Sequence, residues 1–85
     1  MTDTKIPAKL RWACRRGMLE LDVLLGNFLE EAFITLDSHD QEQFVQLLDN
    51  NDQDLFMWLT GRTIPPKANT AAIVGKVREH AYNRH

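Results

Sequence analysis

The stretch LDVLLGNFLEEAFITL, residues 21–36, has the strongest hydrophobic periodicity in the chain and decides its fold. Its apolar residues recur at steps of three and one, which predicts a helix with one broad buried stripe. The stripe consists of Leu21, Leu24, Leu25, Phe28, Leu29, Ala32, Phe33 and Leu36. Phe28 and Leu29 lie in its middle, so we expect them to be among the most buried residues. Glu20 falls off the stripe and faces solvent or a partner, whereas Asp22 lies at its margin and can reach back toward the preceding helix.

A glycine separates this helix from the one before it. No residue in the segment Ala8–Arg16 breaks a helical pattern, and Gly17 then lies where a residue with positive φ ends such a helix. The residues around the glycine read RRGMLELD and place two guanidiniums within a turn of two carboxylates. Among them, we expect Leu19 and Leu21 to supply the apolar side chains that a core needs.

A capping box opens the next predicted helix. Ser38 is followed three residues later by Gln41, a pair that can satisfy backbone N–H groups at a helix N-terminus. The residues that we expect this helix to turn inward are Phe44, Val45, Leu47 and Leu48. Asn51 or Asp52 then caps a short helix over Asp54–Thr60.

The end of the chain completes an all-α architecture. The short helix stops at Gly61, and two prolines make residues 62–68 an extended connector. Asn69 or Thr70 caps a last helix over residues 69–82. Its inward residues are Ile73, Val74, Val77 and Ala81. No segment alternates as a strand would, so the sequence predicts a small five-helix bundle, a single domain over residues 1–85.

Length and composition limit the possible functions. The 85 residues are 44% hydrophobic, which suits one globular domain and excludes disorder. Cys14 is the lone cysteine, and we expect a small buried residue rather than a reactive thiol. No apolar run approaches the roughly 20 residues of a membrane span, and the first residues lack a signal-peptide pattern. We therefore expect a cytoplasmic protein without membrane insertion.

The net charge of −2 hides a segregation of charges along the chain. Residues 17–61 hold ten acids and no base, whereas the segments on either side are basic. A middle segment this acidic repels a phosphate backbone. The charge pattern therefore argues against nucleic-acid binding.

Motifs that carry enzymatic chemistry are missing from the sequence. It has no Gly-rich phosphate loop, no nucleophile beside a base and no paired metal ligands. Glu20 and Asp22 point about 200° apart on a helix, which does not suit a shared acid–base site. We therefore expect recognition of another protein rather than catalysis or metal binding. Trp12 and Met18 are residue types enriched at interfaces, although Trp12 can instead cover the end of the bundle and Met18 can instead fill the core.

Two blocks of the sequence resemble one known family. Arg16-Gly17-Met18-Leu19-Glu20 is similar to the Arg-Gly-x-x-Glu signature of the succinate dehydrogenase assembly factors that promote flavinylation, and residues 12–22 resemble its bacterial branch. A second block resembles the family's second motif and contains Asp52, Asp54, Leu55, Phe56, Trp58, Leu59 and Gly61. The similarity covers residues 8–62, whereas the sequence beyond residue 62 carries no motif that transfers.

The resemblance implies a function and a partner. Such a factor binds the flavoprotein subunit of succinate dehydrogenase, and in some bacteria that of fumarate reductase. It helps FAD become covalently attached to a histidine of that subunit. The factor thus acts on the partner's FAD and binds no FAD stably itself, although a weak contact with FAD stays open as an alternative. We expect the free chain to be a monomer.

The resemblance also transfers a partner-binding patch. Its members are Arg16, Gly17, Glu20 and Asp22, with Arg15, Met18, Lys9 and Trp12 as further partner-binding residues. Two other functions are considered beside it. One is an antitoxin-type regulator that acts by protein–protein interaction. The other is a helix-turn-helix nucleic-acid binder that uses the basic first helix, against which the acidic run argues.

Overall fold

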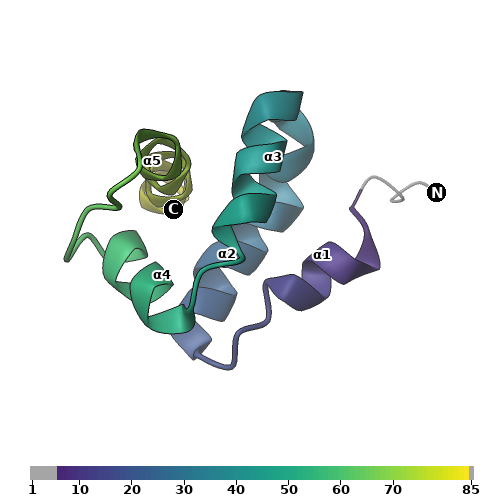
Figure 1. The fold of residues 1–85 in the computed structure, drawn as a ribbon. Helices are drawn as coiled ribbons and strands as arrows, with labels where there is room; N and C mark the ends of the chain where they lie inside the picture. The colour runs from purple at the N-terminus through teal and green to yellow at the C-terminus, as the bar shows by residue number, and fades with distance from the viewer. Residues whose placement is uncertain (1–5, 85) are drawn as a thin grey trace.

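The computed structural model describes residues 6–84 as a bundle of five α-helices and one 3-10 turn. The elements are α1 (Ala8–Ala13), α2 (Leu19–Glu31), η2 (Phe33–Thr35), α3 (Ser38–Leu47), α4 (Asp52–Leu59) and α5 (Ala68–Asn83). In Figure 1, α2 and α3 lie in the middle, α1 flanks them on one side, and α4 and α5 flank them on the other. Residues 6–84 contain no β-strand, so the predicted all-α, five-helix architecture is confirmed.

The core is built around α2, which packs against both α4 and α5. Phe28 and Leu29 are 2% and 1% exposed, as the periodicity predicts. The Phe28 ring lies 5.2 Å from that of Phe44 on α3, centroid to centroid, and the Phe33 ring lies 5.7 Å from that of Phe44. Three helical segments therefore meet in one aromatic cluster, which makes α2 the central support of the bundle.

The helix α1 ends earlier than predicted, at Ala13 rather than Arg16. The backbone N–H of Arg16 donates to a carboxylate oxygen of Asp22 and not to a carbonyl one helical turn back. A side-chain acceptor thus replaces the helical hydrogen bond, and the chain leaves the helix after Cys14. Gly17 has φ +82°, so the predicted positive φ is confirmed.

The prediction that Leu19 supplies the core is wrong. Leu19 is the first residue of α2 and is 79% exposed, whereas Leu21 is fully buried. Residues two positions apart point about 200° apart around a helix, so Leu19 and Leu21 cannot both face the same core. The stripe itself is right, but α2 ends at Glu31 and the stripe continues through the 3-10 turn, whose Phe33 is buried.

Two details of α3 also differ from expectation. Its N-cap is Asp37, whose Oδ1 accepts from the N–H of Asp40 at 2.8 Å, and Ser38 is already helical. The Gln41 side chain donates instead to the carbonyl of Phe33, so no capping box forms. Val45 is 45% exposed rather than inward, because it lies about 100° around the helix from Phe44.

The last two helices begin slightly before their predicted bounds. Asn51 caps α4 by accepting from the N–H of Asp54, which confirms one of the two predicted caps. Helix α5 has Lys67 at its N-cap with no side-chain hydrogen bond, so Asn69 and Thr70 were wrong as caps. Gly61 has φ +79°, as expected where α4 stops. The predicted inward residues Ile73, Val74 and Val77 are buried, and Ala81 is half-buried.

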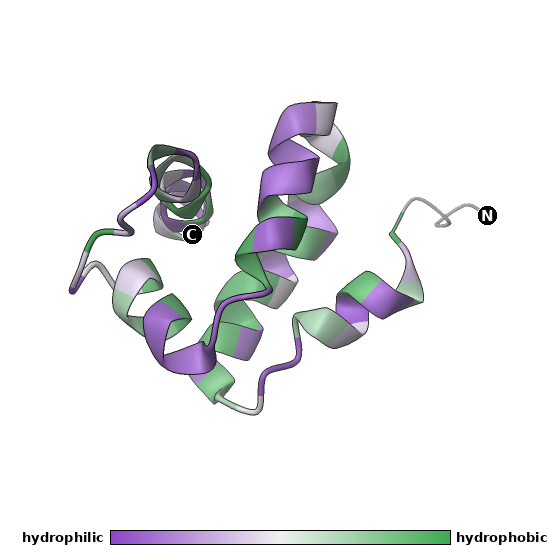
Figure 2. Ribbon diagram, viewed as in Figure 1, coloured by the Kyte–Doolittle hydropathy of each residue, from purple (hydrophilic) through white to green (hydrophobic). Residues whose placement is uncertain are grey.

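Two connections between helices lie close together and are joined by polar contacts. Figure 2 shows a hydrophilic stretch in the segment joining α1 to α2 and a hydrophilic segment joining α3 to α4. They meet at the same end of the bundle, because Arg16 of the first segment donates hydrogen bonds to the carbonyls of Leu48 and Asn50 in the second. This meeting point positions the residues of the predicted patch.

Candidate protein-binding site

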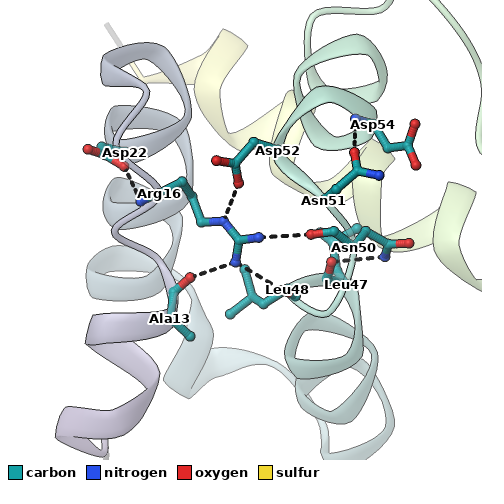
Figure 3. Close-up of polar contacts among 9 residues, drawn as sticks. All are labelled: Ala13, Arg16, Asp22, Leu47, Leu48, Asn50, Asn51, Asp52 and Asp54. Carbon is teal, nitrogen blue, oxygen red and sulfur yellow. Dashed lines mark hydrogen bonds and ion pairs between the residues drawn. The ribbon is translucent and has the colours of Figure 1, made fainter.

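Arg16 joins three elements of the bundle through its guanidinium (Figure 3). Its Nε donates to Asp52 Oδ1 at 2.8 Å, and the two terminal nitrogens donate to the carbonyls of Ala13, Leu48 and Asn50 at 2.8–3.0 Å. These bonds use four of the five N–H donors of an arginine. The side chain is only 16% exposed. Arg16 therefore links the end of α1 to the turn between α3 and α4 and has little capacity left for a second protein.

Asp22 fixes the same turn from the other side. Its Oδ1 accepts from the backbone N–H of Arg16 at 2.6 Å, so the side chain does reach back toward α1, as the sequence indicates. Asp22 also lies in the first turn of α2, where a carboxylate is stabilised by the helix dipole. Together, the Arg16 side chain and the Asp22 carboxylate hold the backbone on both sides of Gly17.

Gly17 is open to a partner. With φ +82°, the residue adopts a backbone conformation that other residues rarely adopt. A Cβ built on it would meet no heavy atom within 4 Å, so nothing among residues 6–84 covers it. Met18 follows in an extended conformation and packs half-buried against the core, which favours the core-filling alternative for this residue.

Glu20 lies one turn beyond Gly17 and is exposed. Among residues 6–84 it forms no ion pair and accepts no side-chain hydrogen bond, unlike Glu30 and Glu31, which pair with arginines. A carboxylate without a partner next to an uncovered glycine presents both charge and backbone to an incoming surface.

The remaining predicted residues lie on α1 and just after it. Lys9, Trp12 and Arg15 are all exposed. Trp12 is 73% exposed, so it does not cover the end of the bundle, and the Arg15 guanidinium lies 5.9 Å from the centre of its ring. An exposed tryptophan with an arginine over it is a composition enriched at protein interfaces.

Cys14 is buried beneath this surface. It is 3% exposed, and burial raises the pKa of its thiol to about 11, although the nearby Arg16 charge opposes that shift. The thiol is therefore protonated at neutral pH and packs as a small apolar side chain, as predicted.

Asp52 is the residue whose role sequence reasoning missed. The sequence indicates it only as a possible helix cap and as a member of the second block. In the structure its carboxylate pairs with Arg16, which connects the two blocks physically. The sequence signal for this ion pair is that the Arg16 block and the Asp52 block occur in the same chain. No sequence signal identifies the carbonyls of Leu48 and Asn50 as acceptors, because every residue has one.

No metal site or membrane-spanning element is found in the described part of the chain. Among residues 6–84, no three or more histidine, cysteine, aspartate or glutamate side chains gather where an ion could bind. The helices of the same residues are too short or too polar to cross a bilayer.

Comparison with known proteins identifies the family. The family profile described as "Flavinator of succinate dehydrogenase" matches residues 8–81. The chain belongs to this family. The match spans both sequence blocks, the whole of α1 to α4 and most of α5, which carries no recognisable motif.

Individual relatives agree with this assignment. The chain is 47% identical over 73 residues to the FAD assembly factor SdhE of Vibrio cholerae, which covers 86% of this chain and 85% of the relative. It is 43% identical over 79 residues to the FAD assembly factor SdhE of Coxiella burnetii, covering 93% and 96%. The solution structure of a UPF0350 protein superposes with a TM-score of 0.77 at 42% identity, over 99% of this chain and 89% of that one.

Proposed function

We propose that this chain is an assembly factor that binds the flavoprotein subunit of succinate dehydrogenase and promotes covalent attachment of FAD to it. Membership in the flavinator family and the FAD assembly factors among its relatives support this function. The flavoprotein subunit of fumarate reductase is a second candidate partner, as the sequence resemblance implies.

One observation carries the proposal to particular residues. Glu20 is exposed and unpaired within residues 6–84, and it lies one turn from the uncovered, left-handed Gly17. The contacts of Arg16 and Asp22 fix this arrangement in the free chain, so binding does not have to order it. Preorganisation of this kind lowers the entropic cost of association.

The mechanism that suits such a surface is positioning rather than catalysis. The covalent bond forms on the partner, between one of its histidines and the flavin methyl group. A factor that favours the conformer of the partner in which this histidine meets the flavin methyl group raises the rate of attachment without contacting either group. We propose that Gly17 and Glu20 contact the partner for this purpose. In this proposal the chain holds no FAD of its own and is not an enzyme.

The antitoxin-type function has no support from the contacts of residues 6–84 or from the relatives. Nucleic-acid binding also has no support. Glu20 and Asp22 lie in the first turn of α2, directly after the basic first helix. Carboxylates at that position repel phosphate.

Binding of the purified flavoprotein subunit, measured by calorimetry, tests the proposal. We expect the wild-type chain to bind and Glu20→Ala to bind at least about tenfold more weakly, as is typical for a central interface residue. Glu42→Ala on α3 is the matched control, because Glu42 is also an exposed helical glutamate without an ion pair among residues 6–84. Wild-type chain that does not bind the subunit refutes the proposal. Equal binding by both variants refutes the role of Glu20.

A further inference from the structure

The outer face of α2 carries an apolar strip beside Glu20. Leu19 is 79% exposed and Val23 is 49% exposed, and they lie one turn apart on the face opposite the buried Leu21 and Leu25. Leaving large apolar side chains in water forgoes the stabilisation that burial would give. A contiguous patch of exposed apolar side chains on a small protein is typical of an interaction site.

A groove continues this strip toward α1. It has a volume of about 440 Å³, and its lining includes Trp12 and Arg15 on one side and Gly26 on the other. Gly26 lies inside α2, where glycine costs about 1 kcal/mol relative to alanine. A Cβ built on it would meet no heavy atom within 4 Å. No contact within residues 6–84 therefore requires a glycine there, and its effect is to leave the groove open.

The charges around the strip are unequal on its two sides. On the α1 side, Arg15 has no carboxylate partner among residues 6–84, whereas Arg11 pairs with Glu30 at 3.0 Å. On the other side, Glu20 has no cationic partner in the same residues. The surface thus presents an apolar centre, a cationic edge and one carboxylate, that of Glu20, without a partner among residues 6–84, while Asp22 and Glu30 are engaged by Arg16 and Arg11. A complementary protein surface has an apolar side chain flanked by an acid on one side and a base on the other.

We propose that Leu19, Val23 and the Trp12–Gly26 groove form a docking surface for the flavoprotein subunit. An apolar side chain of the subunit enters the groove beside Gly26, and a carboxylate of the subunit pairs with Arg15. The strip is continuous with the Glu20 contact, since Leu19 directly precedes Glu20 in the first turn of α2. This inference rests on the proposed function and names the surface through which it operates.

Two substitutions test the surface, and each has a built-in check on folding. Val23→Glu places a charge in the strip, and Val45→Glu on α3 is its matched control, because the two valines are 49% and 45% exposed on different helices. Gly26→Leu fills the groove and raises helix propensity, so it should fold at least as well as the wild type. Circular dichroism melting curves establish that each variant is folded, and titration with the purified subunit measures affinity.

We expect Val23→Glu and Gly26→Leu to bind the subunit at least about tenfold more weakly than the wild type. Val45→Glu should stay within about twofold, as surface substitutions outside an interface do. If both test variants bind like the wild type, the surface is refuted while the proposed function stands. Equal weakening by Val23→Glu and Val45→Glu also refutes it. So does concentration-dependent dimerisation of the free wild type that Val23→Glu abolishes, because a second copy then occupies the face. A wild type that does not bind refutes the proposed function itself.

Discussion

Replacing Arg16 by alanine should destabilise the fold and not only weaken a contact with the partner. The substitution removes one ion pair with Asp52 and three hydrogen bonds to carbonyls of Ala13, Leu48 and Asn50. The Asp52 carboxylate is 39% exposed and regains water, so we assign the pair no more than about 1 kcal/mol. Each carbonyl that exchanges a charged donor for water loses about 0.5–1 kcal/mol. The expected loss in the free energy of unfolding is thus about 3 kcal/mol.

A loss of this size is large for a domain of 85 residues. Such domains have about 5–15 kcal/mol in total, and the melting temperature falls by about 4–8 °C for each kcal/mol, or by about 12–24 °C here. Urea unfolding followed by circular dichroism measures the free energy directly. Arg15→Ala is the matched control, because the neighbouring arginine is exposed over Trp12 and should change stability by less than about 0.5 kcal/mol.

A conservative variant separates the geometry of Arg16 from its charge. Lysine keeps the charge, but its single ammonium cannot reach the carboxylate and all three carbonyls, so Arg16→Lys should recover less than half of the lost stability. If Arg16→Ala unfolds within about 0.5 kcal/mol of the wild type, the structural role is wrong, and the direct partner contact predicted from the resemblance becomes the better explanation.

Three further predictions follow from single residues. Gly17→Val should cost about 1–2 kcal/mol, because valine resists φ +82°, and a change below about 0.3 kcal/mol in urea unfolding would contradict this. Phe28→Ala should lower the free energy of unfolding by about 3–5 kcal/mol in the same measurement. A loss of only about 0.5 kcal/mol, which is typical of a surface substitution, would exclude a central position for the Phe28 ring. Cys14 should alkylate slowly in the folded chain until the pH nears 11, whereas the urea-unfolded chain should react from about pH 9 upward. Because folding raises this pKa, the thiol's contribution to stability is complete below pH 9 and is lost between pH 9 and 11. Equal reaction rates of the folded and unfolded chains at about pH 9 would contradict the buried thiol.

Local sequence patterns predicted the features of the fold that depend on local geometry. The burial of Phe28 and Leu29 follows from helical periodicity, and the positive φ at Gly17 and Gly61 follows from the stereochemistry of glycine after a helix. The cap at Asn51 follows from a hydrogen bond that spans three residues.

Features that depend on distant residues were not accessible in the same way. The acceptors of Arg16 lie 32 to 36 residues away, apart from the carbonyl of Ala13, and two of those three are backbone carbonyls without any sequence signature. Leu19 and Val45 were misplaced because apolar character alone does not give the direction of a side chain on its helix. The exposed Leu19 is part of the proposed docking surface.

The central claim is that this chain promotes covalent attachment of FAD to the succinate dehydrogenase flavoprotein subunit. In-gel flavin fluorescence of the denatured subunit tests it most directly, since only covalently bound FAD survives denaturation. Cells that lack the chain should contain the subunit, detected by immunoblot, with little or no flavin fluorescence. Wild-type chain should restore the fluorescence, and Glu20→Ala should not, while Glu42→Ala should restore it fully. Normal fluorescence of the subunit in cells without the chain would contradict the account.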